Sequence, residues 1–464
     1  MRAGVVVAGT HSGCGKTLTT LGLIRALGQR GLRVQPFKAG PDYLDTGHLS
    51  QAAGRPARNL DSWLLSPESL RESYLRATRD ADIAVVEGVM GMHDGRSGQG
   101  RAASTAEIAA QLGLPVVLVL DVGGMARSAA ALARGYATFD PDVRIVGVIL
   151  NKVGSPNHVR LVRDALTEQG LPVLGWIPYD TALIVPERHL GLVSSAEVDS
   201  GRVADVAARH LERSLDIDRL IDLTRSPSEV SPIPALPPTR SSVPPVVLAV
   251  ARDEAFQFYY EDSLDLLHAA GAEIRFFSPL KDAALPPGTQ GIYLGGGYPE
   301  LYGPALESNA VLRRSIRDAA DGGMPVYAEC GGLMYLMEEM VDAQSRNSAM
   351  CGVFEGRTVM GPGRGAFGYC VVRAKRPTLL LPEGAEVRAH EYHFSTLKHT
   401  GAPFAYDVRN DLSGVTKSDG LARGNVLASY VHLHFASAGF LAERFVAAVR
   451  QFGSTSGAPP PARS

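Results

Sequence analysis

The feature that most constrains the fold of this chain is an alternation of short apolar runs with longer helix-like stretches over residues 1–222. The runs are rich in β-branched residues and cover residues 4–8, 32–37, 83–86, 116–120, 145–150 and 173–177. Strands that alternate with helical stretches are typical of a parallel sheet with crossover helices. All runs but the second are almost entirely apolar, as expected of strands that are covered on both faces. The pattern predicts an α/β fold.

A segment rich in proline and serine interrupts this alternation. Residues 225–245 contain seven prolines and five serines, a composition typical of a linker. The alternation then restarts, with apolar runs at residues 246–251, 274–277, 291–294 and 326–328 and a helix-like stretch at 262–270. Glycine and aromatic residues between about 351 and 387 predict inserted antiparallel strands.

These patterns predict two domains, each built on a mainly parallel sheet. We expect a first α/β domain over residues 1–224, a linker over 225–245, a second α/β domain over 246–449 and a disordered tail over 450–464. The length of 464 residues agrees with two or three domains.

Charge and hydropathy exclude several classes of partner. With 46 basic and 48 acidic side chains the formal charge is −2, which does not suggest nucleic acid. No apolar run approaches the roughly 18 residues of a spanning helix. The apolar run at the N-terminus gives way to a glycine-rich segment too early for a signal peptide. We expect a cytoplasmic enzyme with neither a nucleic-acid nor a membrane partner. The oligomeric state stays open, with a homodimer among the alternatives.

A glycine-rich loop follows the first predicted strand and leads into a helix-like stretch. It runs from Gly9 to Thr17 and reads GTHSGCGKT. Around Gly13 and Gly15 the backbone N–H groups can point at a polyphosphate. Lys16 would meet the β and γ oxygens of ATP, and the Thr17 hydroxyl could ligate Mg²⁺. The loop predicts an ATP site and thus a P-loop NTPase domain over residues 1–224.

The first half of this loop departs from the GxxxxGK[ST] spacing. Thr10 stands where the first glycine belongs, and Gly9 lies one residue upstream. The GKT end and the strand-to-helix context still favour a phosphate loop over an incidental turn. We interpret Cys14, inside the loop, as a space-filling residue.

Acidic residues follow the next predicted strands, and in an open parallel sheet such strand ends face the ligand crevice. These candidates for Mg²⁺ ligation or substrate contact are Asp42, Asp45, Glu87, Asp94 and Asp121. Asn151, after another strand, could reach the nucleotide base or serve as a turn residue.

A cysteine stands between a predicted strand and a predicted helix in the second domain. Cys330 follows the run Val326-Tyr327-Ala328-Glu329 and precedes Gly331 and Gly332. A tight turn at the start of a helix favours the thiolate, and small neighbours leave backbone N–H groups free to hold an oxyanion. The arrangement predicts a nucleophile.

Two histidines and a second glycine segment complete this candidate site. His432 and His434 lie on a predicted strand, whose alternation places both on one face. A base need only be close to its nucleophile in space, so either histidine could serve Cys330. Gly296 and Gly297 offer further backbone N–H groups for the oxyanion. Together these residues indicate amide hydrolysis through a thioester.

With this phosphate loop and this cysteine site, the chain resembles a dethiobiotin-synthetase-like P-loop domain joined to a class I glutamine amidotransferase domain of the cobyric acid synthase type. Over nearly its full length it resembles the cobyrinate a,c-diamide synthase family. The segments that carry the resemblance are residues 9–17, 37–43, 58–61, 87–91, 251–256, 277–280, 295–300, 330–332 and 430–435.

The resemblance implies ATP- and glutamine-dependent amidation of the a and c acetate side chains of a corrin precursor, a tetrapyrrole polycarboxylate. Cys330 would attack glutamine, with His432 as base because it matches the family's Tyr-x-His pattern. ATP would phosphorylate the substrate carboxylate, Mg²⁺ would spread the charge, and ammonia would displace phosphate. The substrate-side and metal-side residues carried over by motif are Asp42, Leu44, Glu87 and Asp94, with Thr17 as a further metal ligand.

Two positions depart from the class I pattern. The glutamate that often stands two residues after the histidine is replaced by His434, so the third member of the triad is absent or comes from elsewhere. The first glycine of the G-x-C-x-G turn is Ala328.

Chemistry supports part of this interpretation independently. A carboxylate is a poor electrophile and free ammonia is protonated at neutral pH, so amidation needs ATP activation and a protected source of ammonia. A phosphate loop and a cysteine amidase in one chain meet both needs. Alternatives are the same reaction on hydrogenobyrinate or a sirohydrochlorin-type tetrapyrrole and, in another class, a nucleotide-switch protein. Residues 360–369 and 388–394 could contact a large polyanion or pack between strands.

Overall fold

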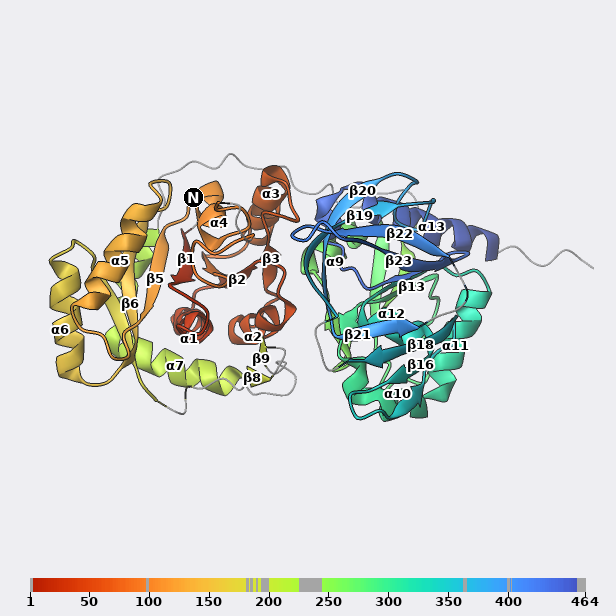
Figure 1. Ribbon diagram of the computed structural model, residues 1–464, viewed down its shortest axis with the longest axis horizontal. Coiled ribbons are helices and arrows are strands. Elements are labelled where there is room, and N and C mark those ends of the chain that lie inside the picture. Colours follow the sequence, from red (N-terminus) through yellow and green to blue (C-terminus); the bar gives the residue numbers. More distant parts are fainter. Residues whose placement is uncertain are drawn as a thin grey trace, which may run out of the picture. The chain divides into compact units, whose positions relative to one another are not determined.

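The computed structural model describes residues 3–96, 100–180, 183, 187–188, 191–192, 200–224, 244–361, 365–398, 401 and 403–456. The chain divides into two compact units, Met1–Pro234 and Ala235–Ser464. The division lies inside the segment interpreted as a linker, whose residues 225–243 fall outside the described residues. Each unit is described by itself (Figure 1).

The first unit is built on a seven-stranded sheet in which every neighbouring pair is parallel, with the order β3-β2-β4-β1-β5-β6-β7. Its strands are β1 (Ala3–Gly9), β2 (Val34–Ala39), β3 (Arg58–Leu60), β4 (Ile83–Glu87), β5 (Val116–Asp121), β6 (Ile145–Val153) and β7 (Val173–Pro178). The six predicted strands are therefore confirmed. Strand β3 was not predicted because its sequence, Arg-Asn-Leu, holds a single apolar residue. A short antiparallel pair, β8 (Glu187–Arg188) and β9 (Gly191–Leu192), stands outside this sheet.

Helices cover both faces of this sheet. They are α1 (Lys16–Gln29), α2 (Tyr43–Ala53), α3 (Pro67–Ala77), α4 (Thr105–Leu112), α5 (Ser128–Phe139), α6 (Pro156–Thr167), α7 (Ser200–Ser214) and α8 (Ile217–Thr224). One buried core joins α1, α2, α7 and α8 to the sheet, and a second joins α5 and α6 to its other face. In Figure 1, α1, α2 and α7 lie below the strands and α4 and α5 above them. The loops that follow β1, β2 and β4 all lie at the carboxyl edge of the sheet.

The second unit contains a nine-stranded mixed sheet with the order β12-β10-β13-β15-β24-β23-β22-β19-β20. The first five strands in this order are parallel and the remaining pairs are antiparallel. The bounds are β10 (Val246–Ala251), β12 (Ala272–Phe277), β13 (Gly291–Leu294), β15 (Val326–Glu329), β19 (Ala366–Ala374), β20 (Glu386–His393), β22 (Phe404–Asn410), β23 (Thr416–Arg423) and β24 (Val426–Ser429). The predicted inserted antiparallel strands are thus present, in β19 and β20.

Two smaller sheets complete the second unit. One has the order β17-β16-β18-β21, and the other pairs β11 with β14. Their strands are β11 (Phe256–Phe258), β14 (Gly296–Gly297), β16 (Met337–Val341), β17 (Asn347–Ala349), β18 (Phe354–Met360) and β21 (Ser395–Lys398). Strand β18 pairs in parallel with β16 and antiparallel with β21.

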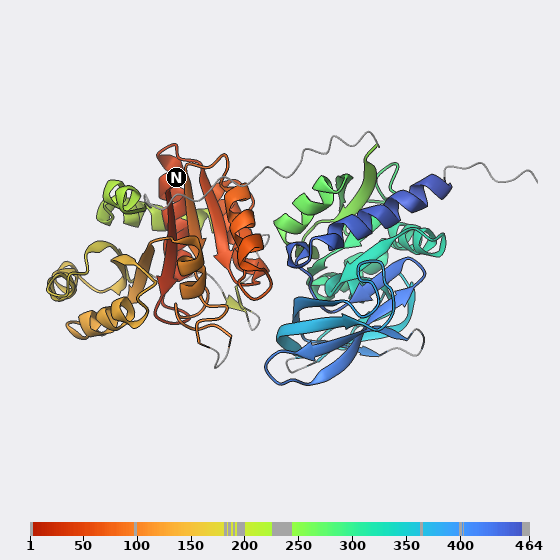
Figure 2. The same ribbon diagram turned by 90° about the horizontal axis from the view of Figure 1, so that it is seen from above.

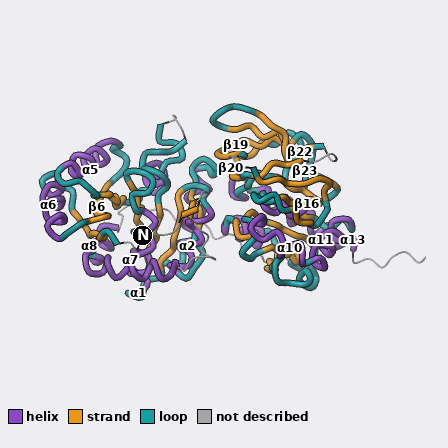
Figure 3. The backbone as a smooth tube through the Cα atoms, turned by 60° about the horizontal axis from the view of Figure 1, so that its bottom comes forward, coloured by secondary structure: helices purple, strands orange, loops and turns teal. Residues whose placement is uncertain are grey.

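The helices of the second unit pack on opposite faces of its large sheet. They are α9 (Glu261–Ala269), α10 (Gly303–Ser308), α11 (Ala310–Asp321), α12 (Gly331–Leu336) and α13 (Phe440–Ser456), with 3-10 turns η2 (Pro299–Tyr302) and η3 (Phe435–Ser437). One core contains α9 and α13, and the other contains α10, α11 and α12. Figure 2 shows α9 in green and α13 in dark blue on the same side of the strands. The antiparallel strands β19, β20, β22 and β23 gather at one side of this unit (Figure 3).

Two sequence predictions are corrected here. Helix α13 continues to Ser456, so residues 450–456 are helical where a disordered tail was expected; residues 457–464 lie outside the described residues. The buried side chains Phe445 and Val449 anchor this helix on the sheet. Strand β24 ends at Ser429, so His432 and His434 lie beyond the strand on which they were predicted. Among the described residues, no helix combines the length and apolarity needed to cross a bilayer.

Candidate active sites

The glycine-rich loop joins β1 to α1 in the first unit, and its shape depends on glycine. Gly13 and Gly15 have φ angles of 79° and 101°, in the region that other residues avoid. A Cβ atom at Gly15 would lie 2.0 Å from Asn151 Nδ2. This Nδ2 atom donates a hydrogen bond to the Cys14 carbonyl at 3.0 Å. Asn151, expected to reach the base or to serve as a turn residue, therefore braces the loop from β6.

The lysine of the loop folds back over it. Lys16 Nζ donates to the His11 carbonyl at 3.0 Å, and its side chain is buried. Burial lowers the pKa of the Lys16 ammonium. Cys14 is fully buried, and a Cβ on Gly9 would lie 2.3 Å from its Sγ, which agrees with a space-filling role.

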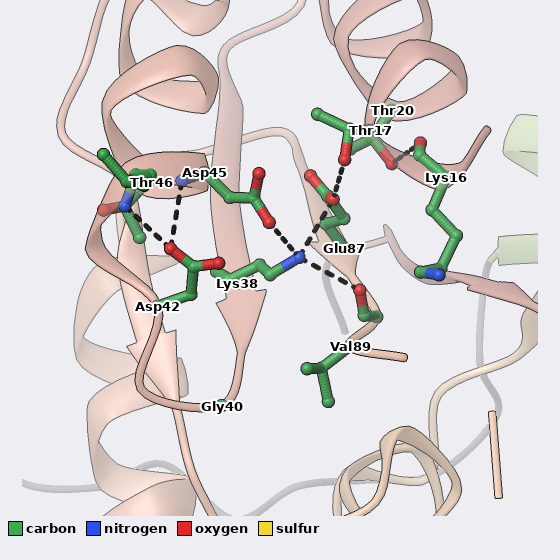
Figure 4. Close-up of polar contacts among 12 residues, drawn as sticks. Lys16, Thr17, Thr20, Lys38, Gly40, Asp42, Asp45, Thr46, Glu87 and Val89 are labelled. Atoms are coloured by element: carbon green, nitrogen blue, oxygen red, sulfur yellow. Dashed lines mark hydrogen bonds and ion pairs between the residues drawn. The ribbon is translucent and has the colours of Figure 1, made fainter. Parts of the chain in front are cut away.

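A network of polar and charged side chains connects the loop to the ends of β2 and β4 (Figure 4). Thr17 Oγ1 donates to Glu87 Oε1 at 2.6 Å. Lys38 Nζ donates to the same Oε1 at 3.0 Å and to the Gly88 carbonyl at 3.1 Å, and it also forms an ion pair with Asp45. The side chains of Lys38 and Glu87 are 4% and 0% exposed. One ammonium thus lies between two largely buried carboxyl groups.

Burial and the lysine act in opposite directions on these carboxyl groups. Burial raises the pKa of Glu87 to about 7, against the opposing effect of Lys38. Burial would also raise the pKa of Asp45, but the Lys38 ammonium outweighs it and the pKa is lowered. For Lys38 the two carboxylates outweigh the effect of burial, and its pKa is raised.

The other acidic candidates occupy different positions. Asp42 caps α2, and its Oδ1 accepts from the Leu44 N–H at 2.7 Å; burial raises its pKa to about 6. Leu44 lies in the first turn of that helix. Asp94 is exposed, and its Oδ2 accepts from the Gly91 N–H at 3.0 Å. Asp121 forms an ion pair with Lys152 at 2.6 Å, away from the Glu87 cluster.

The residues present fit a divalent cation bound with a nucleotide. Glu87 Oε2 is buried and has no hydrogen-bond partner among the described residues. Mg²⁺ is usually held by one or two carboxylates together with phosphate oxygens and water. Glu87 and Asp42 offer carboxylate oxygens, and Thr17 offers a hydroxyl oxygen. A cation at Glu87 Oε2 would stabilise the ionised carboxylate. No group of three or more His, Cys, Asp or Glu side chains able to hold a metal occurs in the described part of the chain, so such a site would depend on the phosphates of the ligand.

Cys330 lies on a strained turn between β15 and α12 in the second unit. Its backbone has φ 47° and ψ −101°, an unfavourable conformation for a residue with a Cβ. Its N–H donates to the Ser429 carbonyl at 2.8 Å, which ties the turn to the end of β24. Its side chain is buried, and burial raises the pKa of the thiol although the Gly331 N–H favours the thiolate. A strained turn that presents a side chain at a strand end is typical of a catalytic nucleophile.

Two glycine segments meet beside this cysteine. A Cβ on Gly331 would lie 3.1 Å from the Gly297 nitrogen, so the two backbones are in close contact. The Gly332 N–H donates to the Gly295 carbonyl at 3.0 Å. A Cβ on Gly296 would lie 2.6 Å from His432 Cε1. The candidate oxyanion residues and one histidine are therefore brought together around Cys330.

The two histidines have different surroundings. His434 Nδ1 accepts from the Ala436 N–H at 3.2 Å and caps η3, and its ring packs on Tyr260 at 4.5 Å. His432 packs on His390, with ring centroids 4.9 Å apart, and its Nδ1 lies 3.5 Å from Glu329 Oε2. His432 therefore lies beside Gly296 and Glu329, whereas His434 caps η3.

The sequence interpretation overlooked two residues of these sites, Lys38 and Glu329. Both are charged side chains buried in strands, and buried charges in strands are rare unless they are paired. Glu329, at the end of the run Val-Tyr-Ala, could have been noticed on this ground, whereas Lys38 lies in a strand that also holds a glutamine and shows no such contrast.

The fold and the sites define a class: a nucleotide-binding domain joined to a glutamine amidotransferase domain. Residues 5–193 match the CobQ/CobB/MinD/ParA nucleotide binding domain. Residues 247–440 match the CobB/CobQ-like glutamine amidotransferase domain.

Relatives of similar length narrow the class to a family. The cobyrinate a,c-diamide synthase of Dehalococcoides mccartyi (strain CBDB1) is 41% identical over 456 residues, covering 97% of this chain and 98% of the relative. That of Salmonella typhimurium (strain LT2) is 44% identical over 455 residues, covering 96% and 98%. The chain belongs to the family of cobyrinate a,c-diamide synthases.

Proposed function

We propose that this protein uses ATP and glutamine to convert the a and c acetate carboxylates of cobyrinic acid to carboxamides. The observation that carries this proposal is the presence, in one chain, of a phosphate loop linked to a buried carboxylate cluster and of a cysteine on a strained turn, directly after a glutamate that lies 3.5 Å from a histidine. The names of the full-length relatives supply the substrate. A nucleotide switch would have no use for the second site.

In the amidotransferase unit, Cys330 is the proposed nucleophile. Its thiol proton passes to His432 while sulfur attacks the side-chain carbonyl carbon of glutamine. The N–H groups of Gly297 and Gly331 would hold the oxyanion, with Gly296 shaping the loop around them. The proton then passes to the leaving nitrogen, ammonia departs, and water hydrolyses the thioester to glutamate.

In the nucleotide-binding unit, the proposed reaction is phosphoryl transfer from ATP to a substrate carboxylate. The backbone of Gly13 and Gly15 with Lys16 would hold the polyphosphate. Ammonia then attacks the acyl phosphate, and phosphate leaves. Asp42, Leu44 and Asp94 are proposed on the substrate side, and Lys38 would keep the Glu87 cluster charge-balanced throughout.

The metal is part of the proposal. Thr17, Glu87 and Asp42 would hold Mg²⁺, which would neutralise charge that develops on the transferred phosphoryl group.

The test is an assay of purified protein with ATP, Mg²⁺, glutamine and a panel of tetrapyrrole acids, with product masses as the readout. We expect the mass of a diamide from cobyrinic acid, together with glutamate and ADP. Diamide from hydrogenobyrinate or a sirohydrochlorin-type acid alone would reassign the substrate. Nucleotide hydrolysis without any amide product would contradict the proposal.

A further inference from the structure

We infer that Glu329, the residue directly before the nucleophile, is the positioning residue that orients His432 for glutamine hydrolysis. This inference rests on the proposed function, because it assigns the third member of the Cys330–His432 pair. Glu329 Oε2 lies 3.5 Å from His432 Nδ1, and both side chains are 1% exposed. Contacts between catalytic groups are often longer without substrate than in the reacting complex.

The need for such a residue follows from the chain itself. Class I enzymes often carry a glutamate two residues after the histidine, and here that position is His434. His434 accepts a backbone hydrogen bond on Nδ1 and caps η3, so it has a separate structural task. A carboxylate that orients His432 must therefore come from another element of the fold.

Strand β15 supplies that acid at the right place. It pairs in parallel with β24, with Glu329 opposite Ser429, so the Glu329 side chain stands beside the segment that carries both histidines. Glu329 Oε1 accepts from the Leu433 N–H at 3.2 Å, between the two histidines. The same oxygen accepts from the Tyr327 hydroxyl at 2.5 Å. The Tyr293 hydroxyl also lies against the Glu329 carboxylate. The Tyr327 hydroxyl and the Leu433 N–H fix Oε1, and Oε2 faces His432.

This orientation has a chemical consequence for the imidazole. A carboxylate only accepts hydrogen bonds, so it retains the His432 proton on Nδ1. Nε2 is then the unprotonated nitrogen that takes the proton of the Cys330 thiol. The imidazolium formed in that step keeps its Nδ1 proton beside the negative carboxylate, which stabilises it.

The test exploits the two donors on Oε1. In Glu329→Gln the Tyr327 hydroxyl and the Leu433 N–H hold the amide oxygen in the Oε1 position, so the amide NH₂ group faces His432 Nδ1. The ring must then accept at Nδ1 and carry its proton on Nε2, the wrong tautomer for a base. We expect kcat for glutamine hydrolysis to fall about 10³- to 10⁴-fold, as for loss of the correct tautomer in other triads. KM for glutamine and amidation with ammonia should change less than about threefold.

The direct readout is the ¹⁵N spectrum of the histidine side chains, in which the His432 signals are identified as those that disappear in His432→Gln. We expect an Nδ1–H tautomer for His432 in the unaltered protein and in Glu329→Asp, and an Nε2–H tautomer in Glu329→Gln. Glu329→Asp should recover part of the lost kcat.

The matched control is Asp419→Asn, which alters another buried acid near the end of β24. Asp419 Oδ2 accepts from Ser429 Oγ and the Tyr430 N–H, both at 2.9 Å. This variant should keep the Nδ1–H tautomer and glutaminase activity within about tenfold.

An Nε2–H tautomer in the unaltered protein would overturn the inference even if Glu329→Gln failed to fold. So would an active Glu329→Gln enzyme, or an equal tautomer change in Asp419→Asn. If the unaltered protein hydrolyses no glutamine, the proposed function fails instead, and the two failures remain distinct.

Discussion

Single charged residues buried inside strands organise both sites. Lys38 lies in β2, where it balances Glu87 and Asp45, and Glu329 lies in β15 beside His432. Such a group is costly to bury alone, so each one implies partners supplied by other elements. The sequence identified Cys330 and Lys16 as candidate site residues because each stands in a recognisable local motif. It did not identify Lys38 and Glu329, because the partners that define their roles lie elsewhere in the chain.

Replacing Lys38 by methionine should destabilise the protein strongly. The change keeps the length of the side chain but leaves two buried carboxylates without their ammonium, at a cost of about 3–5 kcal/mol at neutral pH. The Lys38 ammonium lowers the pKa of Asp45, so it contributes stability above the ordinary carboxyl pKa, and this contribution is lost as pH falls through the lowered pKa. The difference between the variant and the unaltered protein should therefore shrink as the pH falls below about 4, through the lowered pKa of Asp45.

Denaturant unfolding across that pH range measures the effect. The matched control is Lys152→Met, which removes the ion pair to Asp121, whose two side chains are 41% and 16% exposed. It should cost less than about 1 kcal/mol. Equal losses in the two variants, or a Lys38→Met loss that does not vary with pH, would contradict the charge-balance account.

At the scale of elements, short glycine segments set the geometry of the second site. Strand β14 consists of Gly296 and Gly297 and pairs with β11, which holds the loop against Cys330 and His432. Most parallel strands could be predicted because they are nearly continuous apolar runs, whereas β3, with a single apolar residue, could not. The positions of His432 and His434 beyond β24, and the helical residues 450–456, were not predictable, because they depend on tertiary hydrogen bonds and on burial of the α13 face.

Gly296→Ala should impair glutamine hydrolysis selectively. Its Cβ would lie 2.6 Å from His432 Cε1, so the imidazole must move away from its working position. We expect kcat with glutamine to fall about 10²-fold or more, while amidation with ammonia persists. Steady-state kinetics with both nitrogen donors measure this.

The control for that variant is Gly439→Ala, because a Cβ there meets nothing within 4 Å. It should leave both activities unchanged. Full glutaminase activity in Gly296→Ala would show that the loop does not position the base.

At the scale of the whole molecule, the two sites belong to separate compact units with separate cores. Each unit can therefore be disabled by a change at its own site without unfolding the other. The near-neutral net charge of −2 fits this organisation, because anionic ligands would be met by local loops.

Lys16→Ala should abolish amide synthesis with either nitrogen donor and leave glutaminase activity measurable. The lysine belongs to the phosphate loop, and no residue of the Cys330 site lies in its unit. Parallel assays of glutamate release and of amide product measure the separation. Full synthesis by this variant would refute the role of the loop in ATP use.

The measurement that tests the central claim most directly is the nitrogen-donor dependence of Cys330→Ala acting on cobyrinic acid with ATP. If Cys330 only releases ammonia, this variant should form the a,c-diamide from ammonia at close to the unaltered rate and form none from glutamine. Retention of glutamine-dependent synthesis, or equal loss with both donors in a folded protein, would contradict the account.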